Sequence, residues 1–201
     1  MRIGIDFDNT IANYDGVFHA AALDAGLIPE GIATSKDAVR DHLNANGGKD
    51  EFTKLQGHVY GARMDLASVH EGFADFVKRA LADGHELFIV SHKTRHPMLG
   101  PKHDMHAAAR GFLEANSLVG SSDPAAMIPT DQTFFEETKE QKGDRAKSLG
   151  VAMFIDDLPA ILAMPQYEGI DRVLFDPAGT HEGKTDLPGR RVAHWNDIHP
   201  L

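Results

Sequence analysis

The sequence predicts an α/β fold of Rossmann-like topology, in which a parallel sheet is flanked by helices and carries a small α-helical insertion. Short apolar runs without polar alternation recur along the chain, and such runs are typical of strands covered on both faces. Helical patterns lie between these runs, and alternating strands and helices favour a doubly wound sheet. The gap between the first two strands is too long for one crossover helix, which indicates an insertion.

The elements follow in order along the chain. The predicted strands are residues 2–6, 86–91, 151–156 and 171–176, with a weaker one at 132–137. The predicted core helices are residues 71–83, 104–116 and 143–149, and a glycine that ends a helix follows the first and the last of them. In the inserted block we expect helices at 17–25, 35–46 and 49–60, the second with Ser35 as its N-cap. We therefore assign residues 1–14 and 71–201 to the core and residues 15–70 to the cap.

Composition and charge narrow the class of protein. The 201 residues carry 30 acids against 20 bases, a net charge of −10, so there is no basic footprint for nucleic acid or an anionic membrane. The chain has no cysteine, which excludes disulfides and Cys-ligated zinc. No signal-peptide pattern or membrane-length apolar run is seen. We expect a cytoplasmic protein, either a monomer or a homodimer.

Polar side chains stand where the predicted strands end. Asp6 and Asp8 follow the first strand, Ser91 ends the second and the pair Asp156-Asp157 ends a third. Lys139 and Lys142 precede that third strand, and Lys142 is preferred because it lies nearer the start of the predicted helix. In α/β sheets the carboxyl ends of the strands form the ligand site.

Several carboxylates at one sheet edge repel each other unless a cation holds them. Oxygen ligands without His or Cys suit a hard ion, and Mg²⁺ is the expected one. A metal, a hydroxyl and an ammonium around a carboxylate form a receptor for a phosphoryl group, because they neutralise its oxygens from several sides.

The motifs resemble those of the haloacid dehalogenase (HAD) superfamily, in its aspartyl phosphohydrolase form. IGIDFDNT is similar to the first motif, FIVSHKT to the second through Ser91, Lys142 (or Lys139) to the third, and MFIDDLP to the fourth. The helical block placed after the first motif resembles the superfamily's cap, which closes over the active site.

The resemblance implies a role for each residue. Asp6 would attack phosphorus and form an aspartyl-phosphate, and Asp8 would protonate the leaving oxygen and later deprotonate water. Ser91 and the lysine would hold phosphoryl oxygens, and Thr10 would fix the loop. Mg²⁺ would contact Asp6, the Asp8 carbonyl oxygen and Asp156, with Asp157 supporting the metal.

Two further groups are candidates for substrate binding. In LQGHVYGAR, the residues Gln56, Tyr60 and Arg63 lie around two glycines, and we interpret this stretch as a substrate-facing turn. After Ser91, the residues His92, Lys93 and Arg95 form a local basic cluster that suits a second anionic group of the substrate.

The sequence therefore predicts a Mg²⁺-dependent phosphatase acting on a small phosphorylated metabolite; a nucleoside monophosphate and a sugar phosphate fit equally. The alternatives are a phosphotransferase or dehalogenase on the same scaffold, and a non-catalytic phosphometabolite-binding module. Dehalogenases of the superfamily need neither a metal nor a second aspartate. Asp157 has an alternative interpretation as the N-cap of a following helix. His103 and His106 share a helix face, but no third ligand supports zinc.

Overall fold

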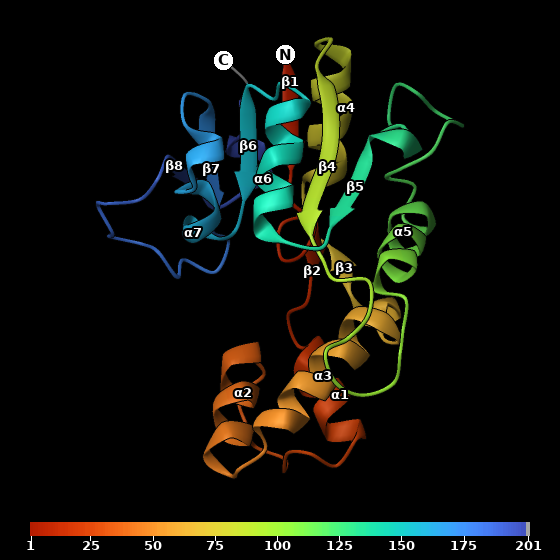
Figure 1. Ribbon diagram of the computed structural model, residues 1–201, viewed down its shortest axis with the longest axis vertical. Helices are drawn as coiled ribbons and strands as arrows, with labels where there is room; N and C mark the ends of the chain where they lie inside the picture. The colour runs from red at the N-terminus through yellow and green to blue at the C-terminus, as the bar shows by residue number, and fades with distance from the viewer. Residues whose placement is uncertain (200–201) are drawn as a thin grey trace. The chain divides into compact units, whose positions relative to one another are not determined.

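A six-stranded sheet forms the centre of the computed structural model, which describes residues 1–199 (Figure 1). The strand order is β5-β4-β1-β6-β7-β8, and every neighbouring pair is parallel. The strands are β1 (Arg2–Ile5), β4 (Glu86–His92), β5 (Thr133–Glu136), β6 (Met153–Asp156), β7 (Asp171–Phe175) and β8 (Arg190–Val192). The predicted α/β sheet is confirmed, and β8 is an edge strand that the sequence did not indicate.

The first strand lies at the middle of this sheet. Ile5 is level with Ile89 of β4 on one side and with Ile155 of β6 on the other. Because all three strands run in the same direction, their carboxyl ends come side by side. Residues that follow them are therefore neighbours in space although they are far apart in sequence.

Helices cover both faces of the sheet, with α6 in front of it and α4 behind it in Figure 1. Against α6 (Lys139–Ser148) and α7 (Pro159–Leu162) packs a cluster that includes Phe154 and Tyr167. On the other face, Phe73 and Phe76 of α4 (Phe73–Ala82) pack on Trp195, with ring centroids 4.8 and 5.0 Å apart. This double cover explains why the strands lack polar alternation.

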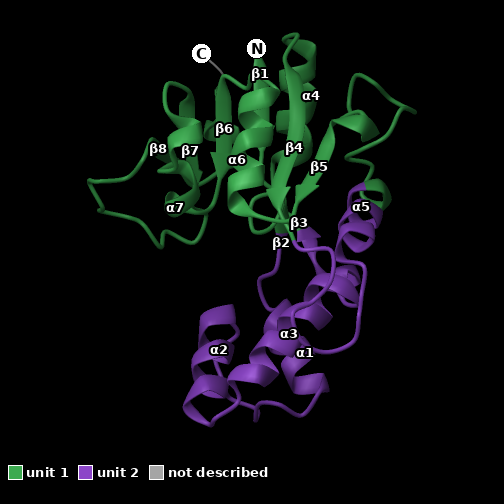
Figure 2. Cartoon of the chain, viewed as in Figure 1, with its two compact units in different colours: residues 1–12, 69–93, 114–201 green, residues 13–68, 94–113 purple. Residues whose placement is uncertain are grey.

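The chain divides into two compact units (Figure 2). The first contains the sheet and is made of residues 1–12, 69–93 and 114–201; the second is made of residues 13–68 and 94–113. Residues 94–113, which the sequence-based division placed in the core, therefore group with the helical block. The short strands β2 (Ala12–Asn13) and β3 (Ser68–Val69) pair where the chain passes between the units.

The second unit is helical. Its helices are α1 (Val17–Asp24), α2 (Lys36–Ala45), α3 (Lys49–Gly61) and most of α5 (Met105–Ala115). The helix predictions in this block are confirmed, and the Ser35 side chain accepts a hydrogen bond from the Ala38 N–H as the N-cap of α2. Short 3₁₀ turns complete the fold: η1 (Met64–Leu66), η2 (Thr130–Gln132), η3 (Pro165–Tyr167) and η4 (Trp195–Asp197).

The glycines of LQGHVYGAR serve packing inside the second unit. Residues 55–61 belong to α3, so the prediction of a turn there is wrong. A Cβ atom on Gly57 would lie 2.4 Å from Cβ of Pro97, and one on Gly61 would lie 2.4 Å from Cβ of His103. These glycines, one helical turn apart, let the segment 97–103 lie directly against the helix.

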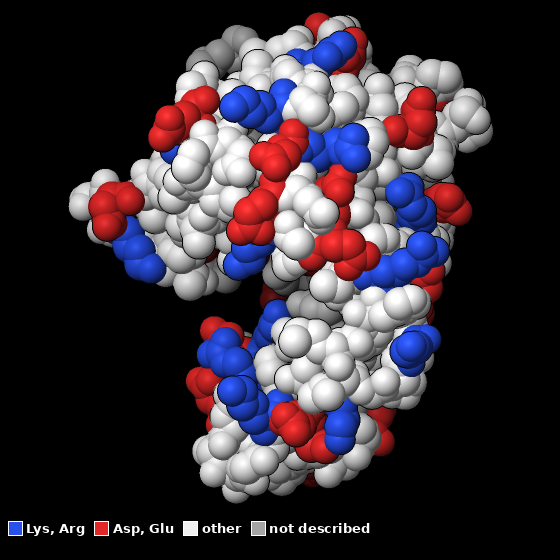
Figure 3. Space-filling view, in the orientation of Figure 1, with Lys and Arg blue, Asp and Glu red and all other residues white. Residues whose placement is uncertain are grey.

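The surface carries both signs of charge. On the face of the first unit seen in Figure 3, acidic and basic side chains are interspersed. Among residues 1–199, no helix has the length and the apolar character that crossing a membrane requires.

Candidate active site

Three neighbouring strands bring the predicted site residues together. Asp6 directly follows β1, Ser91 lies near the end of β4, and Asp156 is the last residue of β6. The N–H of Asp6 donates to the carbonyl oxygen of Ile155 at 2.9 Å, so the backbone of Asp6 still belongs to the sheet ladder. The sheet therefore fixes the position of the Asp6 carboxylate.

The Asp6 carboxylate is buried and surrounded by donors. Its Oδ1 accepts hydrogen bonds from Oγ of Ser91 at 2.8 Å and from Nζ of Lys142 at 2.6 Å. Oγ1 of Thr10 lies 3.4 Å from Oδ2 and donates a longer bond. Asp6 is 5% exposed, and Thr10, Ser91 and Lys142 are also buried. Such a carboxylate can act as a nucleophile toward a group with anionic oxygens, because the neighbouring hydroxyl and ammonium can bind those oxygens.

Of the two candidate lysines, the structure brings Lys142 to the site. Helix α6 begins with a capping box in which Thr138 accepts from the N–H of Gln141 and Gln141 accepts from the N–H of Thr138. The Lys142 ammonium lies between two carboxylates and also donates to Oδ2 of Asp156 at 2.5 Å. Lys139, at the first residue of the same helix, is exposed.

Charge keeps the Lys142 ammonium protonated. Burial alone lowers its pKa, but the charges of Asp156 and Asp6 outweigh that effect and raise the pKa above its usual value. The group is therefore a fixed positive charge between the strand ends.

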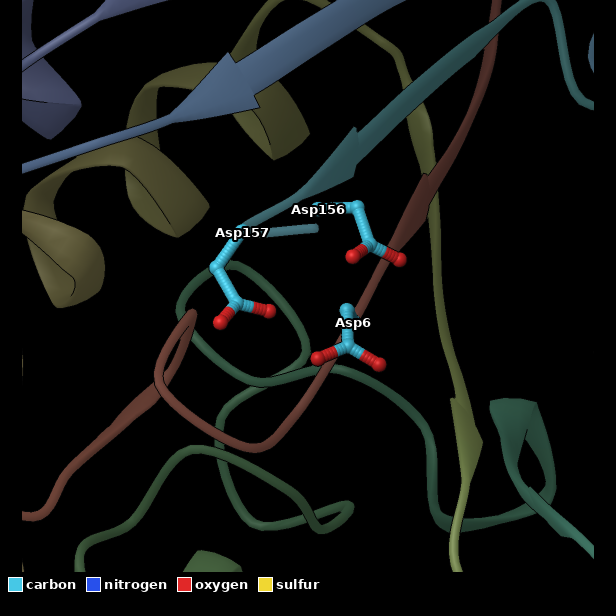
Figure 4. Close-up of side chains that lie close together, drawn as sticks. All are labelled: Asp6, Asp156 and Asp157. Carbon is cyan, nitrogen blue, oxygen red and sulfur yellow. The ribbon is translucent and has the colours of Figure 1, made fainter. Parts of the chain in front are cut away.

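The acidic pair completes a cluster of three carboxylates. Asp6, Asp156 and Asp157 each place an oxygen within 4.8 Å of the others, and Figure 4 shows the three side chains close together. Burial raises the pKa of Asp157, and the charges of Asp6 and Asp156 raise it further. Burial raises the pKa of Asp156 to about 6 even beside Lys142. Burial is the largest cause of both shifts and neighbouring carboxylates add to it, so the charged form of each of these two side chains is disfavoured.

The backbone after β6 fixes Asp156 and leaves the side chain of Asp157 without a capping role. The N–H of Leu158 donates to Oδ1 of Asp156 at 2.9 Å, which fixes that side chain. The N-cap of α7 is Leu158, without a side-chain capping bond, so the alternative in which Asp157 caps this helix is not supported.

Lys93 lies in a different environment from the one its sequence context suggested. Its ammonium donates to both carboxylate oxygens of Asp8, each at 2.8 Å, and its side chain is 3% exposed. The predicted contact of Lys93 with an anionic group of the substrate stays a prediction. A signal for the pairing was present in the sequence: Ser91 and Lys93 are two residues apart at a strand end, as Asp6 and Asp8 are, and alternate residues of an extended chain share a side.

The other basic residues after Ser91 have separate partners. His92 is half-buried, and burial and the charge of Lys142 lower its pKa, so the ring favours the neutral form. Arg95 belongs to the second unit, where its guanidinium pairs with Asp104 at 3.0 Å.

The remaining candidates also lie in the second unit. Oη of Tyr60 accepts a hydrogen bond from Nζ of Lys36 at 2.8 Å, and Arg63 pairs with Asp24 at 3.1 Å. Gln56 is half-buried in α3. Their part in substrate binding stays a prediction. In the described part of the chain, the three aspartates are the one group of three or more acidic, His or Cys side chains placed to hold a metal ion.

Comparison with known proteins finds similarity of fold. No family model matches the sequence, and no curated protein matches it significantly. A HAD-superfamily hydrolase from Ehrlichia chaffeensis aligns with 98% of this chain and 92% of its own, at 12% identity and a TM-score of 0.54. A family IA HAD hydrolase from Entamoeba histolytica aligns with 98% and 95%, at 14% identity and a TM-score of 0.55.

A solved dehalogenase is similar to the same degree, with 12% identity, a TM-score of 0.53 and coverage of 97% of this chain and 93% of its own. Enzymes of different chemistry thus share this architecture, so the likeness identifies the fold and leaves the reaction to the residues of the site. Together with the parallel sheet, these comparisons show that the chain has the fold of the haloacid dehalogenase superfamily hydrolases.

Proposed function

We propose that the protein is a Mg²⁺-dependent phosphatase that hydrolyses a small phosphomonoester metabolite through an aspartyl-phosphate on Asp6. The observation that carries this proposal is the buried Asp6 carboxylate, held by Ser91 and Lys142 next to the acidic pair Asp156-Asp157. Transfer of a phosphoryl group requires an attacking oxygen and donors for the non-bridging oxygens. Asp6 would be the attacking group, and Ser91 and Lys142 would be the donors.

The residues support a two-step reaction. In the first step, the Asp6 carboxylate attacks phosphorus while the bond to the leaving oxygen breaks, and Asp8 gives its proton to that oxygen to release an alcohol. In the second step, water attacks phosphorus, Asp8 takes the proton of the water, and the bond to Asp6 breaks to release inorganic phosphate. Ser91 and Lys142 bind the phosphoryl oxygens in both steps.

The carboxylate cluster fits a magnesium ion. Its ligands are oxygen atoms alone, which hard cations prefer, and the three carboxylates lie close enough for one ion to contact all of them. Asp6, Asp156 and Asp157, with the backbone carbonyl of Asp8, would hold the ion. Bound there, Mg²⁺ supplies charge neutralisation for the phosphoryl oxygens.

The same observations argue against a dehalogenase, and the other two alternatives are distinguished by the products they give. A dehalogenase on this scaffold has no use for the acidic pair at the end of β6 or for a second acid at position 8. A phosphotransferase would use the same aspartyl-phosphate, and it is distinguished by its product, a transferred phosphoryl group in place of free phosphate. A non-catalytic binding module would bind phosphorylated metabolites without turnover.

We further propose that the helical unit acts as the superfamily's cap and sets the choice of substrate. The substrate would be a small phosphorylated metabolite of the cytoplasm, and a nucleoside monophosphate and a sugar phosphate remain equal candidates. The enzyme would act as a monomer or a homodimer.

The proposal is tested by phosphate release from a panel of sugar phosphates and nucleoside monophosphates with Mg²⁺. We expect turnover of at least one compound, loss of turnover in EDTA, and loss of turnover in Asp6→Asn. Asp144→Asn, which changes an exposed carboxylate on α6, is the matched control and should retain activity. Acid quenching should trap a phosphoenzyme that hydroxylamine cleaves, as expected of an acyl phosphate. Unchanged turnover in Asp6→Asn, or full activity without divalent metal, would contradict the mechanism.

A further inference from the structure

We propose that Lys93 is a positioning residue that orients Asp8 for proton transfer to the leaving oxygen. Because an ammonium favours the ionised form of Asp8, the proton comes from the substrate, which binds as the monoanion of its phosphate and passes that proton through Asp8 to the leaving oxygen. This inference rests on the proposed phosphatase function and adds a residue to it. The contact that carries it is the pairing of one ammonium with both oxygens of one carboxylate, at 2.8 Å each.

The pairing fixes the plane of the carboxylate. A single hydrogen bond leaves a carboxylate free to turn about its Cβ–Cγ bond, whereas contacts to both oxygens restrain that rotation. The Asp8 side chain is 20% exposed and stands in a loop, beside Asn9 in a left-handed conformation with φ of 58°.

Lys93 itself is firmly held. Its backbone N–H donates to the carbonyl oxygen of Glu136 at 2.8 Å, which ties it to the end of β5. Its Nζ lies 5.4 Å from the centroid of the Phe7 ring, and Phe7 is fully buried in a T-shaped contact with Phe135. The backbone contact with β5 and the ring of Phe7 thus hold the Lys93 ammonium in place, so it can support the Asp8 carboxylate rigidly.

Orientation matters because proton transfer demands a short contact. A general acid acts over about 2.6–3.2 Å, and a misplacement of about 1 Å can lower a rate by about 100-fold. Removal of Lys93 should therefore slow the step that uses Asp8 and leave the contacts of Ser91 and Lys142 with the phosphoryl group in place.

The leaving group gives a readout that separates this role from a structural one. An alkoxide leaves only when it is protonated, whereas 4-nitrophenolate leaves well without a proton. We expect Lys93→Met to lower kcat for the best alkyl phosphate of the metabolite panel by about 10–100-fold. For 4-nitrophenyl phosphate the loss should stay below about 3-fold, and KM and inhibition by orthovanadate should change by less than about 2-fold.

Three further variants test whether Lys93 acts through Asp8. Lys93→Arg retains a cation that can contact both carboxylate oxygens, so it should recover most of the alkyl phosphate rate. In an Asp8→Asn background, Lys93→Met should lower the remaining rate by less than about 2-fold, because the group it orients is already gone. Lys147→Met, at an exposed site on α6, is the control for loss of a lysine and should behave as wild type.

The outcomes separate the two proposals. Equal losses on both substrates, a full additional loss in the Asp8→Asn background, or no loss on either substrate would overturn the role of Lys93 while the Asp6 result still supports a phosphatase. A wild type that releases no phosphate from any compound would overturn the phosphatase proposal, and the role of Lys93 with it. Loss confined to the alkyl phosphate and absent in the Asp8→Asn background supports the inference.

Discussion

The buried ammonium of Lys142 should be essential for the stability of the first unit in the absence of metal. Lys142→Met removes the charge and shortens the unbranched side chain by one atom. Asp6 and Asp156, which are 5% and 0% exposed, then face each other without the cation that lies between them. Removing one partner of a buried ion pair costs about 3–5 kcal/mol, because the remaining charge stays buried without compensation. For a chain of this size, we expect the melting temperature to fall by about 6–20 °C.

The assay is urea unfolding in EDTA, followed by tryptophan fluorescence. The chain has a single tryptophan, Trp195, which is fully buried in the first unit, so its signal reports on that unit. Lys147→Met on the same helix is exposed and should change stability by less than about 0.5 kcal/mol. Adding Asp6→Asn to Lys142→Met should recover part of the loss, since it removes one of the repelling charges. A loss below about 1 kcal/mol for Lys142→Met, or one equal to that of the control, would refute the reasoning.

Two further predictions concern other parts of the chain. Gly57→Ala should destabilise the second unit by about 1–2 kcal/mol although alanine favours helices, because its Cβ would meet Pro97; amide exchange of residues 97–103 should accelerate. Gly111→Ala, in open space on α5, is the control and should leave that exchange unchanged or slower. Asp176→Asn should destabilise the first unit by about 1.5–3 kcal/mol at pH 7, because Asp176 accepts from Arg191 at 2.6 Å and from two backbone N–H groups. Burial raises the pKa of Asp176, but these bonds outweigh it and the net shift is downward, so its stabilisation is complete above about pH 4 and is lost at lower pH; urea midpoints that differ equally at pH 7 and pH 3 would contradict this.

The core of the fold could be predicted from the sequence because the local hydrophobic patterns agree with the packing of the sheet. Strands covered on both faces leave uninterrupted apolar runs, as in β1, β4 and β6, and the helix ends carry recognisable stops. The side chains that the structure brings together around Asp6 were predictable for a related reason. Chemistry in a parallel sheet is confined to the carboxyl ends of strands, so few positions needed to be considered.

The parts that were missed depend on contacts between distant segments. Nothing local distinguishes residues 94–113 from a core segment; they join the second unit by packing on α3, where Gly57 and Gly61 leave room for them. The same glycines suggested a turn, because glycine marks turns more often than it marks close approach of another segment. Strand β8, with three residues at the edge of the sheet, is too short to leave a pattern.

The distribution of buried charge indicates where the fold has given up stability. Among residues 1–199, five charged side chains are buried, and four of them lie at the proposed site: Asp6, Lys93, Lys142 and Asp156. With the half-buried Asp8 and Asp157, the site holds four carboxylates against two ammonium groups. These buried charges do not serve stability, because well-packed apolar side chains of similar volume would stabilise the fold at least as well. The two lysines divide the acids between them: Lys142 pairs with Asp6 and Asp156, the proposed nucleophile and a proposed metal ligand, and Lys93 pairs with Asp8, the proposed acid and base.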